Sequence, residues 1–194
     1  MKWFACMLVI NLVAVACVAG SAPTSVPAPS MSATPGEGGQ VMTMTISSSA
    51  FENGKAIPVK YTCDGQNVSV PLQWSDPPTA AKSQALIVDD PDAPGGMFVH
   101  WVLYNLPPAA RELPEGVKTD PTLPDGSRNG SNGAGRSGYM GPCPPSGTHH
   151  YFFKLYALDA MLSLATGATK DQLLKAMQGR ILAQAQVMGT YSRK

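Results

Sequence analysis

The chain has 194 residues, enough for one folded domain and a leader segment. Its 14 basic and 13 acidic residues give a formal charge of +1 without a long run of either sign, which gives no support to nucleic-acid binding through a basic face. The 19 glycines and 18 prolines favour short strands and loops over long helices.

Residues 1–16 have the features of a secretory signal peptide. Lys2 precedes an apolar run from Trp3 to Val15 that only Asn11 interrupts, and small residues follow. A transmembrane anchor is the alternative, although the run is short for a span of about 20 residues. Ala14-Val15-Ala16-Cys17 resembles a bacterial lipoprotein signal, so we expect an exported protein with a lipid on Cys17. Cleavage by an ordinary signal peptidase, which would give a soluble periplasmic or secreted protein, remains the alternative.

Residues 17–40 are predicted to form a flexible tether. They are rich in Ser, Ala, Pro, Gly and Thr and carry one charge, at Glu37. Such a segment cannot bury enough apolar surface to fold and serves as a spacer. We therefore expect a folded domain over residues 41–194, anchored to a membrane and facing the periplasm or the cell exterior.

The domain has the pattern of a mainly β protein. Five segments have strand-like composition or alternation: Val41–Ile46, Ile57–Tyr61, Ala85–Val88, Phe98–Tyr104 and Tyr151–Leu158. The second is weaker, because its Pro58 is tolerated only at a sheet edge. Residues 106–147 are full of Pro, Gly and Asn and predict long loops. These features predict an antiparallel β-sandwich with long loops.

One helix is predicted near the C-terminus. Thr169-Lys170-Asp171-Gln172 has the pattern of a capping box. Apolar residues then repeat at helical spacing from Leu173 to Ala185. We expect this C-terminal α-helix to cover one side of a sheet.

The candidate ligand-binding side chains lie at the ends of predicted strands. They are Asp90 and Asp92 after one strand, and His100, His149 and His150 within or beside two others. Side chains alternate along a strand, so His149 and Tyr151 share one face while His150 points to the other. His149 and His150 therefore cannot both enter one pocket if the strand is regular.

Two rigid segments accompany these side chains. Asp90–Pro94 contains two prolines that fix the backbone, and Ser137–Gly147 is rich in Gly and Pro. Such backbone can cradle an anion to which nearby histidines donate, although each segment is also a common structural turn.

Cys63 and Cys143 are the two cysteines of the predicted domain. In an oxidising compartment they could pair, or they could be two separate buried thiols.

The ordered motifs closely resemble the phosphatidylethanolamine-binding protein family. The resemblance lies in Asp90–Pro94, His100–Pro107 and Gly141–Tyr151, while Tyr61–Gly65 and Leu155–Asp159 are similar to its bacterial, Raf-kinase-inhibitor-like branch. It implies a β-sandwich with a small pocket for phosphate-type groups at one end. By position, it assigns Asp90, His100, His149 and Tyr151 to that pocket and places Cys143 in the backbone loop beside it.

Two positions depart from the family pattern. The family usually has Arg at the position of His150. The replacement by His removes a permanent positive charge from this position. The family's Asn-Asp-aromatic-Gly loop is here Asn132-Gly133-Ala134-Gly135. We expect these changes to affect the affinity and identity of the ligand more than the fold.

The leading functional hypothesis is a binding protein rather than an enzyme. Its predicted ligand is a small anion or phosphate-bearing molecule such as a phospholipid headgroup, and neither a cofactor nor nucleic acid is expected. The predicted ligand-binding residues are Asp90, Asp92, His100, Cys143, His149 and Tyr151.

Three alternatives remain open at this point. One is a regulator or inhibitor of a protein partner outside the cytoplasm. A more remote one is a hydrolase that uses Cys143 as nucleophile beside an Asp–His pair. The last is a metal-binding protein, because Asp and His side chains are acceptable zinc ligands, but their spacing matches no metal motif and no metal is expected.

Overall fold

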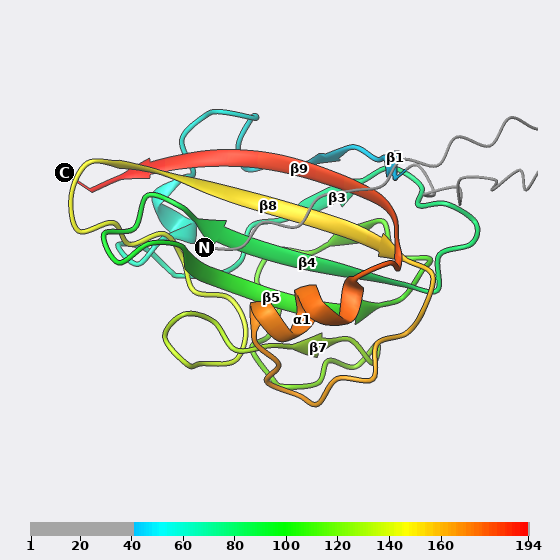
Figure 1. The fold of residues 1–194 in the computed structure, drawn as a ribbon. Coiled ribbons are helices and arrows are strands. Elements are labelled where there is room, and N and C mark those ends of the chain that lie inside the picture. Colours follow the sequence, from blue (N-terminus) through cyan, green and yellow to red (C-terminus); the bar gives the residue numbers. More distant parts are fainter. Residues whose placement is uncertain (1–40, 194) are drawn as a thin grey trace, which may run out of the picture. The chain divides into compact units, whose positions relative to one another are not determined.

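A computed structural model describes residues 41–193 of the chain (Figure 1). The predicted signal peptide, the candidate lipidation site Cys17 and the predicted tether over residues 17–40 lie outside the described residues. Within residues 41–193, no helix is long and apolar enough to span a bilayer.

Two β-sheets form the framework, which confirms the mainly β prediction. The larger sheet has the order β1-β9-β8-β4-β5-β7, formed by Met42–Thr43, Ile181–Ser192, Thr148–Leu158, Ser83–Asp90, Phe98–Leu106 and Arg128–Asn129. The smaller sheet has the order β2-β3-β6, formed by Ile46–Ser47, Leu72–Trp74 and Glu112–Leu113. All pairs are antiparallel except β1 with β9, which is parallel.

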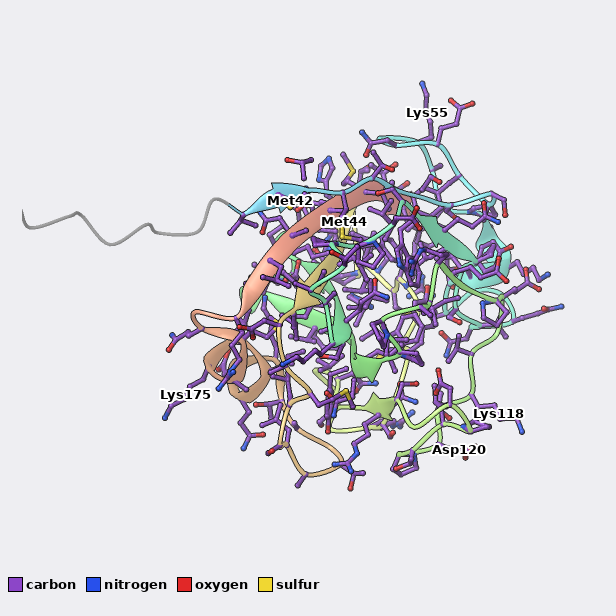
Figure 2. The ribbon with its side chains drawn as sticks, turned by 90° about the vertical axis from the view of Figure 1, so that its right-hand side faces the viewer. Met42, Met44, Lys55, Lys118, Asp120 and Lys175 are labelled. Carbon is purple, nitrogen blue, oxygen red and sulfur yellow. A yellow bond between two sulfur atoms is a disulfide. The ribbon has the colours of Figure 1, made fainter. Side chains whose placement is uncertain are left out.

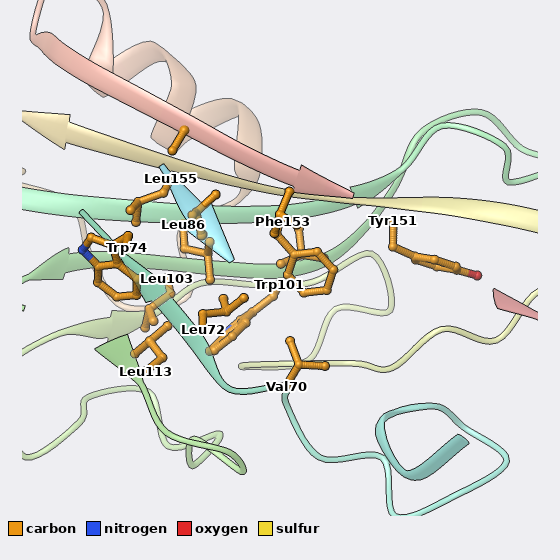
Figure 3. Packing of buried hydrophobic residues seen from close by; sticks show 14 of the residues in the cluster. Val70, Leu72, Trp74, Leu86, Trp101, Leu103, Leu113, Tyr151, Phe153 and Leu155 are labelled. Carbon is orange, nitrogen blue, oxygen red and sulfur yellow. The ribbon is translucent and has the colours of Figure 1, made fainter. Parts of the chain in front are cut away.

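The main hydrophobic core lies between the two sheets. Alternate residues of the larger sheet, such as Leu86 and Phe153, are fully buried and share one cluster with Leu72 of the smaller sheet. Figure 3 shows these side chains directed towards one another across the sandwich, with Tyr151 at one end of the cluster. The opposite face of the larger sheet buries a second cluster, to which Ile87 and the helix contribute. Both faces of β4 are therefore buried.

The strand β8 has the alternation that the sequence predicted. His149 and Tyr151 are buried on the core side, and His150 is half-buried on the other side. The capping box is also confirmed, because Thr169 accepts from the backbone of Gln172 and Gln172 accepts from the backbone of Thr169. This box begins α1, Lys170–Met177.

The predicted helix is wrong beyond Met177. The helix ends there, and Gly179 follows with φ of 70°, a left-handed conformation that glycine adopts without strain. Residues Ile181–Ser192 then form β9, which pairs along its length with β8. The C-terminal element is therefore a long strand between β8 and the short β1, and α1 precedes it.

Two predicted strands need correction. Val41–Ile46 is divided between the sheets, because Met42 pairs with β9 and Ile46 pairs with β3. Ile57–Tyr61 is not a strand, since a 3-10 helix η1 occupies Val59–Tyr61. Pro58 has no N–H to give to a ladder, and its carbonyl accepts from the backbone of Tyr61 in the 3-10 turn.

The long segment between β5 and β8 is fixed by side chains as well as by the short strands β6 and β7. The buried Asn129 accepts a hydrogen bond from the Trp101 indole at 2.8 Å and donates to the carbonyls of Lys118 and Asp120.

Figure 2 shows Lys118 and Asp120 at the periphery, well separated from the outward-pointing Lys55 and Lys175. These lysines do not gather on one face.

Candidate functional site

A cavity of about 250 Å³ lies where β4 ends and where β5 and β8 begin. Antiparallel pairing brings these three strand ends together, because β4 runs against both of its neighbours. The cavity is lined by Asp90, Ala93, Pro94, Phe98, His100, Met140, Cys143, Pro144, Pro145 and His149. Four of the six side chains that the sequence assigned to a ligand site therefore line one cavity.

Asp90 and His149 form a buried pair at this cavity. The Nδ1 atom of His149 is 2.7 Å from Oδ2 of Asp90, and the two residues are 6% and 3% exposed. A carboxylate accepts hydrogen bonds, so Nδ1 carries the proton and donates it. The other carboxylate oxygen accepts from the backbone N–H of Asp92 at 2.8 Å. Asp90 thus fixes the imidazole and leaves its Nε2 for a ligand.

His100 is held in the same way by the backbone. Its Nδ1 lies 2.7 Å from the carbonyl oxygen of Met140, which can only accept. The ring packs against Phe98 and Tyr151, with centroid distances of 4.9 and 5.1 Å. Burial lowers the pKa of His100, so the neutral imidazole is favoured at neutral pH.

Tyr151 lies behind His100 and does not line the cavity. Its ring contacts the imidazole edge-on, and its hydroxyl is buried without a hydrogen-bond partner among the described residues. Burial raises the pKa of Tyr151, which keeps the phenol protonated. The predicted pocket tyrosine therefore supports the position of His100 and lies on the same face of β8 as His149.

Asp92 was predicted to bind the ligand, and the structure places it outside the cavity lining. Its Oδ2 accepts from the backbone N–H of His150 at 2.8 Å and from the ring Nδ1 at 2.6 Å. The side-chain hydrogen bond from His150 lowers the pKa of Asp92. The pair therefore joins the turn after β4 to the outward face of β8.

Cys63 and Cys143 form a disulfide, with Cα atoms 5.4 Å apart. Backbone contacts accompany it, because Cys63 donates to the carbonyl of Pro142 at 3.0 Å and Gly141 donates to the side chain of Asn67 at 2.8 Å. The pairing that the sequence left open is thus made in the structure. Cys143 contributes to the cavity wall as a disulfide and has no thiol to act as a nucleophile.

Most of the remaining wall is apolar and was not assigned to the site from sequence. Pro94, Pro144 and Pro145 belong to the two rigid segments that the sequence singled out, so their composition was the available signal. Phe98 was recognised only as the start of a strand. The role of the Met140 carbonyl has no sequence signal, because any residue supplies a backbone carbonyl.

A larger hollow of about 610 Å³ lies beside the start of α1 but offers less chemistry. Its lysine, Lys170, is bonded at 2.5 Å to the buried Asp89, which also accepts from Lys154 at 2.7 Å. Asp89 therefore ties α1 and β8 together on the face opposite to Asp90.

Within residues 41–193, no group of three or more His, Cys, Asp or Glu side chains is arranged to hold a metal ion.

Comparison with known proteins gives a consistent result. Residues 47–192 match the family model for phosphatidylethanolamine-binding protein. A UPF0098 protein of Methanothermobacter thermautotrophicus is 51% identical over 150 residues, which cover 77% of this chain and 99% of the relative.

Two solved structures are similar over the same extent. A phosphatidylethanolamine-binding protein homologue from Chlamydia trachomatis has a TM-score of 0.73 and 46% identity, covering 78% of this chain and 99% of its own. Escherichia coli YbcL, described as a new member of the mammalian family, has a TM-score of 0.72 and 31% identity with the same coverage. Almost the whole of each relative therefore matches about four fifths of this chain.

Proposed function

The chain belongs to the phosphatidylethanolamine-binding protein family, and on that premise we propose that it binds a small phosphate-bearing ligand. Three ionisable side chains carry this proposal, because Asp90, His100 and His149 converge on one cavity. Its volume of about 250 Å³ is below the usual range for drug-sized ligands, which is roughly 300–1,000 Å³. The expected ligand is accordingly a headgroup or another small phosphate compound, with any lipid chains outside.

The proposed binding mode uses the two imidazoles and the apolar wall. The Nε2 atoms of His100 and His149 would contact the phosphate oxygens, while Phe98 and the prolines would cover the carbon atoms next to them. Hydrogen bonds with a charged partner contribute roughly 1.5–3 kcal/mol each, so two of them give about 3–6 kcal/mol. That range corresponds to millimolar or somewhat tighter binding, unless further contacts of the ligand add to it.

We propose no catalytic step at this site. An Asp–His pair needs a nucleophile beside it for acyl transfer. Among the described residues that line the cavity there is no Ser or Thr, and the sulfur of Cys143 is in a disulfide. The proposed role is therefore binding alone.

We also propose that the protein is exported and held at a membrane by a lipid on Cys17. The signal-like residues 1–16 and the spacer-like residues 17–40 support this. The Cys63–Cys143 disulfide is consistent with it, since disulfides persist mainly in oxidising compartments. Mass spectrometry of the native protein tests the proposal: a lipid mass on Cys17 that a Cys17→Ser variant lacks would support it, and an unmodified chain would not.

The binding proposal is tested by NMR titration. The protein is produced from Val18 onward, which keeps every described residue; a solved relative consists almost wholly of the matching part and folds without the rest. Phosphate, O-phosphorylethanolamine and short-chain phosphatidylethanolamine are added in turn. Expected shifts centre on Asp90, His100 and His149.

Two neighbouring substitutions provide the specificity control. His149→Ala should abolish the shifts, because that ring lies at the cavity. His150→Ala should retain them, because that ring points to the other side of β8 and pairs with Asp92. Failure of all three ligands to shift any resonance at millimolar concentration would contradict phosphate binding and make a protein partner the better explanation.

A further inference from the structure

The hydrogen bonds of the two imidazoles determine what the cavity offers a ligand. Nδ1 of His149 donates to Asp90, and Nδ1 of His100 donates to the carbonyl of Met140, each at 2.7 Å. A neutral imidazole has one donor and one acceptor nitrogen. In both neutral rings the remaining atom, Nε2, is therefore an acceptor. This is the wrong polarity for a phosphate oxygen that carries no hydrogen.

The other side chains of the lining do not correct this polarity. Pro94, Pro144 and Pro145 have no backbone N–H, and no Lys or Arg is among the described residues that line the cavity. Asp90 brings a negative charge, and both of its oxygens already accept hydrogen bonds. With neutral histidines the cavity thus carries a charge of −1 and opposes a dianion.

The charged groups around the cavity are already paired. On the far face of β4, Asp89 is bonded to Lys154 and Lys170. At the outer side of β8, Asp92 is bonded to His150. From β8 itself Tyr151 faces His100 with a protonated hydroxyl, and Tyr191 of β9, paired in register with His149, donates to Asp64. No permanent positive charge from these elements is left for the ligand.

We propose that the cavity takes the proton-bearing form of a phosphate monoester and disfavours phosphodiesters. This rests on the proposed phosphate binding and specifies its ligand class. The P–OH group of the monoester monoanion donates to Nε2 of His100. His149, whose Nδ1–H is held by the Asp90 carboxylate, takes a proton on Nε2 and donates it to a P–O⁻ oxygen. A diester has no P–OH group and leaves the buried acceptor of His100 without a partner.

Proton uptake from the solvent is the measurable consequence. At pH 7.5 a simple phosphate monoester is mainly a dianion, since its second pKa is about 6. Forming the proposed complex from this dianion and neutral imidazoles takes up two protons, one on the phosphate and one on Nε2 of His149. Each linked proton strengthens binding up to tenfold when the pH falls by one unit, so two strengthen it up to about a hundredfold.

Isothermal titration calorimetry on the chain from Val18 tests the inference with methyl phosphate and dimethyl phosphate. Each is titrated at pH 7.5 and 6.5, in two buffers of different ionisation enthalpy, which gives the number of protons taken up. We expect the monoester to bind more than tenfold more tightly at pH 6.5 than at pH 7.5, with uptake of close to two protons at pH 7.5. The diester should bind at least tenfold more weakly at pH 6.5. His150→Ala should behave as the unmodified chain.

The possible failures are distinguishable. Equal binding of both esters without proton uptake would overturn the inference and leave phosphate binding intact. If neither the monoester nor the diester binds between pH 5.5 and 7.5, phosphate binding and the inference are overturned together. The ring tautomers provide an independent check by long-range ¹H–¹⁵N NMR of the unliganded protein. A neutral His100 that carries its proton on Nε2 would also overturn the inference.

Discussion

Removal of the Cys63–Cys143 disulfide should lower stability strongly and leave ligand binding nearly unchanged. The two cysteines are 80 residues apart in the sequence. For a closed loop of that length, the chain-entropy relation gives about 4.5 kcal/mol of stabilisation at 25 °C. For a domain of about 150 residues this corresponds to a fall in Tm of roughly 9–18 °C.

The folded state should keep its cavity, because other bonds hold the same segment. The backbone of Cys63 still donates to Pro142, the backbone of Gly141 to Asn67, and the Tyr139 hydroxyl to the carbonyl of Tyr61 at 2.8 Å. The disulfide therefore acts mainly by restricting the unfolded chain. Phosphate affinity of the variant should stay within a few-fold of that of the unmodified protein.

The assay is urea unfolding of the chain from Val18, with and without a reductant. A Cys63→Ser, Cys143→Ser double variant is the control, because it should lose the same stability and show no further response to the reductant. The fall in unfolding free energy should be several kcal/mol in both cases. A change below about 1 kcal/mol would refute the reasoning, since the chain-entropy relation predicts several times that value for so long a loop. Loss of binding in the folded double variant would refute the assignment of the effect to the unfolded chain.

Three further predictions concern the buried pair, the core and an alkaline titration. Asp90→Asn should weaken phosphate binding at least tenfold by NMR titration, because the neutral amide no longer stabilises a protonated His149; unchanged affinity would contradict the pair's role. Phe153→Ala should lower the unfolding free energy by about 3–5 kcal/mol in urea, because the ring is fully buried; a loss under 1 kcal/mol would contradict the packing. Burial raises the pKa of Tyr61 to about 12, and its hydroxyl also donates to Glu115. Because the folded-state pKa is raised, the stability linked to the protonated phenol is fully present below pH 10 and is lost as the pH rises through 12. Tyr61→Phe, which cannot ionise, should therefore gain stability relative to the unmodified chain between pH 8 and pH 12 by urea unfolding; a stability difference that stays the same at both values would contradict this.

The sequence predicted those helices and strands best whose residue pattern fits only one kind of element. The alternation from His149 to Leu155 could only be a strand with one buried face, and the capping box at Thr169 fixed where the helix begins. The segment after Gly179 was ambiguous. Ala185 fits helical spacing from Ile181, but Ala183, Ala185 and Val187 also alternate with polar residues, as in a strand. Pairing with β8 decides for the strand, and such pairing is a long-range contact that local spacing does not contain.

The site was predictable in its ionisable side chains and less so in its geometry. Asp90 and Asp92 look equivalent in the sequence, since both precede or follow proline in one turn. Only the structure shows that Asp90 contacts His149 and that Asp92 contacts His150. The carbonyl that sets the tautomer of His100 belongs to Met140, and no side-chain pattern could identify it. Yet that hydrogen bond decides whether Nε2 of the neutral His100 ring accepts or donates towards a ligand.

The position of β4 within the larger sheet explains why the site and the scaffold stay separate. Asp89 and Asp90 are adjacent in sequence and point to opposite faces of the strand. Asp89 binds two lysines and holds α1 and β8 to the sheet, whereas Asp90 orients His149 at the cavity. A shift of one residue in the pairing would exchange these two carboxylates and move every apolar side chain of β4 from one core to the other. Each core is packed around its own side chains, Val88 in one and Ile87 in the other, so the residues that build the two cores also keep the cavity's carboxylate in place.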